Sequence, residues 1–174
     1  KQVYEMHLVC YNISMNILVL SDTHGELDRA LEMYERISTS ICKIDRIIHC
    51  GDFIKDAHEI EAQTGIPVSC VPGNCDGCNK ENFEIIDSPA GKIMITHGHM
   101  ENVKFSLMNL KYLAMQHKCV AVCFGHTHVP VNEVSSGIRF INPGSLTNPR
   151  GGSKSSCALI ISEDKKLAAT IIEY

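Results

Sequence analysis

Short polar clusters carrying carboxylate, amide and imidazole groups recur along the chain. Each of them follows an apolar stretch, and none of the metal-binding groups in them is a thiolate. The seven groups are Asp22, His24, Asp52, Asn74, His97, His126 and His128. Such oxygen and nitrogen ligands bind Mn, Fe, Zn, Ni or Co. Because seven protein ligands are too many for one ion, the clusters indicate a site for two divalent metal ions.

A dinuclear site of this kind has a recognisable chemistry. Two metals about 3.5–4 Å apart, bridged by one carboxylate, leave open positions for water or hydroxide. Two divalent ions, two aspartates and one bridging hydroxide leave a net charge of roughly +1, which attracts phosphate anions. The metals supply a nucleophile near neutral pH without Ser, Cys or Lys. This chemistry favours metal-assisted hydrolysis of a phosphoester.

The clusters need strands that bring them to one place. Apolar runs that stop at a polar cluster predict buried strands, and open α/β sheets bind ligands at the carboxyl ends of such strands. The runs lie at residues 17–20, 46–50, 67–71 and 120–124. We therefore expect the seven side chains to meet at one edge of the sheets.

Helices and further strands complete the predicted fold. The helices are expected over residues 26–38, 55–63 and 103–117. A hairpin is expected from residues 83–87 and 92–96 around a four-residue turn, and short strands from residues 131–134, 138–141, 157–162 and 167–173. This order predicts an α/β (α+β) fold, a two-sheet mixed β-sandwich flanked by helices.

Composition excludes several classes of protein. The chain has 174 residues with 44% hydrophobic and 21% charged residues, which fits one domain. The formal net charge of −4 gives no basic field, so nucleic acid is disfavoured as the main partner. No apolar run approaches the ~20 residues of a membrane span, so no membrane partner is expected.

The chain holds nine cysteines and nine histidines. The cysteines are odd in number and lie mostly in apolar stretches, which favours free thiols and a cytoplasmic location over a disulfide scaffold. Cys75 and Cys78 form a single C-x-x-C pair, for which redox chemistry is the minor interpretation. Four histidines stand outside any motif and are interpreted as surface or capping residues: His7, His49, His58 and His117.

The ordered blocks resemble the calcineurin-like metallophosphoesterase superfamily. They read Asp-x-His at residues 22–24, Gly-Asp at 51–52, Gly-Asn-Cys-Asp at 73–76, His-Gly-His at 97–99 and Gly-His-x-His at 125–128. The resemblance implies a four-layer fold. It also implies that Asp22, His24 and His128 bind the first metal, that Asn74, His97 and His126 bind the second, and that Asp52 bridges them.

Within this superfamily, the chain resembles the branch of YfcE-type small phosphodiesterases. Like them it carries the Gly-Asn-Cys-Asp variant and the Asn-Pro-Gly-Ser turn at residues 142–145. Cys75 stands where most of the superfamily has a His, and a neutral thiol is a poorer proton donor than imidazolium near neutral pH. We therefore expect fast cleavage of esters with good leaving groups. Residues 53–57 lack the Asp-Arg-Gly of the protein phosphatases, which argues against phosphoprotein substrates.

The sequence thus predicts a dinuclear-metal phosphodiesterase acting on a small phosphoester through a metal-bridging hydroxide. Manganese is the first expectation, with Ni, Zn, Fe or Co as alternatives. Catalytic roles are expected for Asp52, Asn74, Cys75 and His99, although His99 is equally well a hydrogen-bonded loop residue. The alternative function is a non-catalytic interaction module on the same fold, like the retromer subunit that has lost part of this ligand set.

Two further expectations concern organisation. Residues 1–14 are predicted to be an N-terminal extension that is non-native or disordered, and residues 15–174 to form a single metallophosphoesterase domain. The apolar strands of the C-terminal half offer an edge for pairing into a homo-oligomer.

Overall fold

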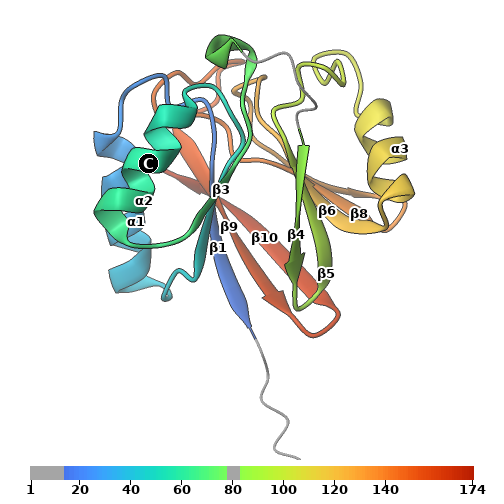
Figure 1. Ribbon diagram of the computed structural model, residues 1–174, viewed down its shortest axis with the longest axis horizontal. Helices are drawn as coiled ribbons and strands as arrows, with labels where there is room; N and C mark the ends of the chain where they lie inside the picture. Colours follow the sequence, from blue (N-terminus) through green and yellow to red (C-terminus); the bar gives the residue numbers. More distant parts are fainter. Residues whose placement is uncertain (1–13, 78–82) are drawn as a thin grey trace, which may run out of the picture.

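Two five-stranded mixed sheets pack face to face in the computed structural model, which describes residues 14–77 and 83–174 (Figure 1). The first sheet, sheet A, has the strand order β10-β9-β1-β2-β3. Its strands are β1 (Met15–Leu20), β2 (Arg46–His49), β3 (Val68–Cys70), β9 (Ser156–Glu163) and β10 (Lys166–Glu173). Strands β1, β2 and β3 are parallel, so their carboxyl ends lie at the same edge of the sheet.

The second sheet, sheet B, has the order β4-β5-β6-β8-β7. Its strands are β4 (Phe83–Ser88), β5 (Gly91–Thr96), β6 (Cys119–Cys123), β7 (Val131–Ser135) and β8 (Ile138–Asn142). Strands β5, β6 and β8 are parallel, and the hairpins β4–β5 and β7–β8 add an antiparallel strand at each edge.

The outer faces of the sheets are covered by helices. Helices α1 (Asp28–Ser40) and α2 (Ile54–Thr64) lie over sheet A, and α3 (Met108–Gln116) lies over sheet B (Figure 1). Ile37 of α1 packs in one cluster with Leu18 of β1, and Leu110 of α3 packs in another with Val122 of β6. The layers are therefore helices, sheet, sheet and helix, which confirms the predicted fold class.

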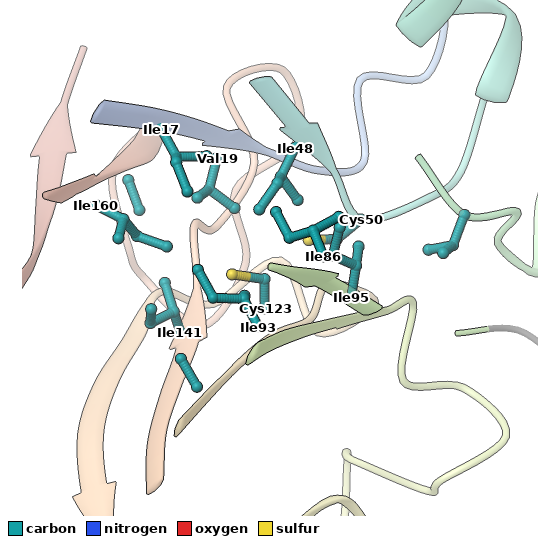
Figure 2. Close-up of a cluster of buried hydrophobic side chains, with 13 residues drawn as sticks. Ile17, Val19, Ile48, Cys50, Ile86, Ile93, Ile95, Cys123, Ile141 and Ile160 are labelled. Atoms are coloured by element: carbon teal, nitrogen blue, oxygen red, sulfur yellow. The ribbon is translucent and has the colours of Figure 1, made fainter. Parts of the chain in front are cut away.

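The core between the sheets is formed by the strand faces that point away from the helices. Ile17 and Val19 of β1 point into it (Figure 2). Leu18 instead packs with the helices, so alternate residues of the strand face the two layers. Ile93 and Ile95 of β5 meet them from sheet B. Because both faces of these strands are covered, their sequences are continuous apolar runs and do not alternate between apolar and polar residues.

The predicted helix over residues 103–117 is wrong at its start, because α3 begins at Met108. Residues 101–105 form a separate turn, in which the carbonyl of Asn102 accepts from the N–H groups of Phe105 and Ser106, and the chain leaves the helical conformation at Ser106 and Leu107 before α3 begins. The N–H of Val103 instead donates to the carbonyl of Gly98, and the Ser106 hydroxyl accepts from the Met108 N–H. The turn of the β4–β5 hairpin is also shorter than predicted, because the strands extend to Ser88 and Gly91.

Met15 opens β1, as the apolar pattern suggests. The predicted extension lies almost wholly outside the described residues and stays a prediction, as does the single domain over residues 15–174. None of the helices in the described ranges is both long and apolar enough to cross a membrane.

Candidate metal centre

The loops that follow five strands bring the predicted ligands together at one end of the sandwich, the upper end in Figure 1. Sheet A contributes Asp22 and His24 after β1, Asp52 after β2 and Asn74 after β3; sheet B contributes His97 after β5 and His126 and His128 after β6. Backbone hydrogen bonds join neighbouring loops, since the N–H of Asp22 donates to the carbonyl of Gly51 at 3.0 Å. The expected meeting of the clusters is confirmed.

Four of these side chains form a tight group. The ligand atoms of Asp22, His24, Asp52 and His128 all lie within 4.8 Å of one another. Nε2 of His128 is 3.1 Å from Oδ1 of Asp22, and Nε2 of His24 is 3.5 Å from Nε2 of His128. Three of the four are buried and His24 is half-buried, so the group is largely removed from solvent.

The remaining predicted ligands adjoin this group through His97. Nε2 of His97 is 3.2 Å from Oδ1 of Asn74 and 3.5 Å from Oδ1 of Asp52. The ring of His126 lies with its centroid 5.1 Å from that of His97. The structure thus brings all seven side chains together, and their assignment to two individual metals stays a prediction.

The surroundings of one carboxylate oxygen, Oδ1 of Asp22, indicate a binding site for a cation. Oδ1 of Asp22 is buried and has no hydrogen-bond partner within the described part of the chain. Its neighbour is Nε2 of His128, whose other ring nitrogen lies 2.6 Å from the carbonyl of Asn148 and therefore carries the hydrogen of the neutral ring. In that neutral ring, the lone pair of His128 Nε2 faces Oδ1 of Asp22. The two groups repel each other unless a divalent ion or a proton lies between them. The donor set therefore fits a metal.

Neighbouring backbone groups fix the orientation of the other ligands. Nδ1 of His97 donates to the carbonyl of Cys50 at 2.8 Å, which leaves Nε2 directed into the site. Oδ2 of Asp22 accepts from the Ser21 hydroxyl at 2.5 Å and from the N–H of His126 at 3.1 Å. Such outer contacts hold ligating side chains in the geometry that a metal requires.

Two glycines of the motifs are required for space. A Cβ at Gly73 would lie 2.1 Å from Oδ1 of Asp52, and a Cβ at Gly125 would lie 1.9 Å from the Ser21 hydroxyl oxygen and 2.7 Å from Oδ2 of Asp22. The loops can therefore approach the aspartates only because these positions lack a side chain.

Burial and mutual charge set the protonation of the site. Burial and the neighbouring His97 and Lys104 lower the pKa of His126 to about 4, so its imidazole is neutral at pH 7. Burial raises the pKa of Asp22, but the adjacent imidazoles of His128 and His97 lower it by more, and the net pKa lies below its usual value. Burial lowers the pKa of His128, which the Asp22 carboxylate outweighs, so that this pKa is raised. An ionised Asp22 and a neutral His126 are the forms that bind metals.

Cys75 and His99, which the sequence assigns to substrate or proton transfer, lie beside the predicted ligands. The N–H of Cys75 donates to Oδ1 of Asp52 at 2.8 Å, and its sulfur accepts from the amide of Asn74 at 3.4 Å. Burial and the Asp52 carboxylate raise the pKa of Cys75 to about 11. The ring of His99 lies 5.3 Å from that of His97, centroid to centroid. The catalytic roles of Cys75 and His99 stay predictions.

The interpretation of His49 as a surface or capping residue is wrong, because its side chain is fully buried at the end of β2. Its Nδ1 accepts from the N–H of Gly51, so its Nε2–H donates to the Thr23 hydroxyl at 3.0 Å. That hydroxyl donates to Asp56 of α2 at 2.6 Å. These contacts, the His49–Thr23–Asp56 chain, connect the loop of Asp22 and His24 to the loop of Asp52.

The other histidines without a motif fit the prediction better. His58 is exposed, and His117 is half-buried with its ring 5.0 Å from that of Phe83. His7 lies outside the described residues, and so does Cys78 of the C-x-x-C pair. No disulfide joins the cysteines within residues 14–77 and 83–174.

Three residues of the sequence motifs, Asp76, Asn142 and Ser145, form hydrogen bonds that support the loops of the site. Asp76 accepts hydrogen bonds from the N–H groups of Phe53 and Ile54 and so caps the start of α2. Asn142 is buried and donates to the carbonyl of Gly125, and the hydroxyl of Ser145 donates to the carbonyl of Asp22. The turn at residues 142–145 therefore supports the metal loops from beneath.

Comparison with known proteins supports this description. Residues 15–165 match the calcineurin-like phosphoesterase superfamily domain. The Bacillus subtilis (strain 168) protein named Probable metallophosphoesterase YsnB is 34% identical over 164 residues, which cover 92% of this chain and 90% of that protein. Phosphodiesterase YfcE of Escherichia coli (strain K12) is 36% identical over 174 residues, which cover 84% of this chain and 87% of YfcE.

A solved structure of a predicted phosphoesterase is also similar to this chain. The crystal structure of a conserved protein of Streptococcus pneumoniae TIGR4, described as a predicted phosphoesterase, superposes with a TM-score of 0.74. The two chains are 27% identical, and the match covers 92% of this chain and 90% of the other. With the matching domain, the shared fold and the gathered ligand set, the chain belongs to the calcineurin-like phosphoesterase superfamily.

Proposed function

We propose that the protein is a phosphodiesterase that uses two divalent metal ions to hydrolyse a small phosphoester. The observation that carries this proposal is the position of Asp52 between two groups of imidazoles. Its Oδ1 is 3.5 Å from Nε2 of His97, and its Oδ2 is 4.0 Å from Nε2 of His24. A carboxylate whose two oxygens face different sets of ligands is suited to bridge two ions.

The bound ions would supply Lewis acids that polarise the ester oxygens and lower the pKa of water near phosphorus. Asp22, His24 and His128 would hold one ion, and Asn74, His97 and His126 the other. The hydrogen bonds from His97 and His128 to backbone carbonyls keep these rings oriented. The ring of His99 adjoins that of His97, and the proposal assigns to His99 a hydrogen bond to an ester oxygen.

Several features support a small diester as the substrate. A site with a net positive charge favours anions, and the chain carries a formal net charge of −4, so attraction of a phosphate is confined to the metal centre. YfcE, the E. coli relative, is named a phosphodiesterase. We propose manganese as the first metal to test, then Ni, Zn, Fe and Co, because mixed carboxylate and imidazole ligands accept all of them.

The proposed place of action is the cytoplasm. The seven described cysteines are free, which supports this location.

Asp52→Ala tests the proposal. We expect the variant to lose both bound metal, measured by elemental analysis, and hydrolysis of bis-nitrophenyl phosphate, because it removes the bridging carboxylate. Asp87→Ala is the matched control, since Asp87 is exposed on β4 and its removal should change neither quantity. Retention of metal and activity by Asp52→Ala would refute the assignment. Metal binding without hydrolysis of any phosphoester, in the wild type, would favour the alternative of a non-catalytic interaction module.

A further inference from the structure

A cavity adjoins the loops that carry the metal centre. It has a volume of about 290 Å³ and is lined by Phe53, Ile54, Lys55, Cys75 and Asp76; we call it the Phe53 pocket. Phe53 follows Asp52 directly, and its ring lies edge-on to that of His24 with centroids 5.4 Å apart. Cys75 is hydrogen-bonded through its N–H to Asp52. Two residues of the pocket wall are therefore in direct contact with predicted metal ligands.

The backbone of Phe53 is in an unfavourable conformation for its side chain. Its φ of 73° and ψ of 64° are left-handed, where a bulky residue is strained and glycine is not. The conformation is held by Asp76, which accepts a hydrogen bond from the Phe53 N–H at 3.0 Å. Strained residues of this kind cluster at functional sites, where the surroundings fix them. A large side chain at a position that favours glycine indicates a use for its ring.

The ring contributes little to the core. Phe53 is 38% exposed and is in none of the three buried apolar clusters. Besides His24, it covers the backbone at Gly25, where a Cβ would lie 3.6 Å from the ring. Phe53 both lines the pocket and is partly exposed, so its side chain is open to contact with a ligand.

The polar wall of the pocket carries two groups of opposite charge, Lys55 and Asp76. Both oxygens of Asp76 already accept N–H groups, from Phe53 and Ile54 on one side and from Gly73 on the other. Lys55 forms no ion pair within the described part of the chain. The pocket therefore combines an aromatic face with a cation.

From these observations we propose that the Phe53 pocket binds a planar aromatic group of the phosphoester, whose phosphoryl group lies at the metal centre. Aromatic rings stack on one another with an affinity beyond that of simple burial. Lys55 would favour aromatic groups with acceptor oxygens on their rim, as nucleobases have. This proposal rests on the proposed function and names the class of ester that the same site prefers.

Binding of two phosphonates separates the pocket from the chemistry. Phenylphosphonate and methylphosphonate share the phosphonate group and have no ester bond to cleave. We expect the manganese-loaded wild type to bind the phenyl compound more tightly in titration calorimetry. In Phe53→Gly this preference should fall about threefold to tenfold, the range expected for an aromatic pair. Phe53→Leu, which keeps the bulk and the backbone strain without the aromatic face, should lie in between.

The controls address folding and metal content. Phe105→Gly is the matched substitution, because Phe105 is 90% exposed and outside the pocket, and it should leave the preference unchanged. Phe53→Gly should keep or raise the melting temperature, because glycine relieves the left-handed strain. An unchanged phenyl preference in Phe53→Gly, or equal binding of both compounds by the wild type, would overturn the pocket proposal alone. Binding of neither phosphonate by metal-loaded wild type would overturn the proposed function as well.

Discussion

The backbone N–H of Cys75 and the side chain of Asp52 are joined by a hydrogen bond of 2.8 Å. The same loop places the sulfur of Cys75 next to the amide of Asn74. Any side chain at position 75 is therefore held close to the proposed bridging carboxylate. Because burial and Asp52 raise the pKa of the thiol to about 11, this side chain is neutral at pH 7 and a weak acid.

Cys75→His should therefore extend the range of leaving groups. Alkoxide leaving groups need a proton in the transition state, whereas nitrophenolate does not, and general acids contribute about 10²–10⁴-fold. We expect kcat for an alkyl phosphodiester to rise at least about tenfold, with little change for bis-nitrophenyl phosphate. Cys75→Ser, which restores no acid, should give no gain. Equal rates for the two esters in the wild type would contradict this account of Cys75.

Metal binding should stabilise the fold through Asp22. At a metal concentration about 100 times Kd, the gain is about 2.7 kcal/mol, or about 5–10 °C in melting temperature for a chain of this size. Asp22→Asn should lose most of this gain, because the buried Oδ1 is the oxygen that lacks a hydrogen bond within the described part of the chain. Thermal unfolding with manganese and with EDTA measures the effect, and Asp87→Asn should respond like the wild type. A full metal-induced gain in Asp22→Asn would count against Asp22 as a ligand.

His49 should make the fold sensitive to acid. Burial lowers its pKa to about 4, against about 6.5 in an unfolded chain. Between these values the unfolded state binds the extra proton, so stability is complete above pH 6.5 and falls as the pH drops towards 4. The loss attributable to His49 is on the order of 3 kcal/mol at pH 4 and below.

His49→Gln removes this titration while its amide can still donate to Thr23. Urea unfolding of both proteins in EDTA, from pH 7.5 to 4.5, should show a smaller loss of stability on acidification in the variant. His58→Gln is the control, because His58 is exposed on α2. Parallel pH profiles for the wild type and His49→Gln would contradict the buried neutral state of His49.

Asp76 should contribute to stability by capping α2 from a distant part of the chain. Its carboxylate accepts N–H groups of Phe53, Ile54 and Gly73. Asp76→Ala leaves these donors without this partner, and we expect a loss of about 1–2 kcal/mol, as for other capping residues. Asp76→Asn keeps one acceptor oxygen and should lose less. Chemical unfolding measures both, and an unchanged stability in Asp76→Ala would show that water replaces the cap.

Strands and ligands could be predicted because their signals are local. Ile17 and Val19 stand in a continuous apolar run, and Asp22 follows the run within two residues of Leu20. The role of His49 could not be predicted, because its partner Thr23 lies 26 residues away in sequence. The cap formed by Asp76 could not be predicted for the same reason, because Asp76 lies 23 residues after Phe53, from whose N–H it accepts a hydrogen bond. Apolar spacing favours a start of α3 at Val103, but residues 101–105 form a separate turn and Ser106 caps the N–H of Met108, a local competition that spacing does not show.

The candidate ligands are divided between the two sheets. Asp22, His24, Asp52 and Asn74 follow strands of sheet A, whereas His97, His126 and His128 follow strands of sheet B. A chain in which the sheets have formed without docking would offer only an incomplete ligand set on each side. High-affinity metal uptake would then report that the two sheets are docked, because neither sheet alone supplies the full set of candidate ligands.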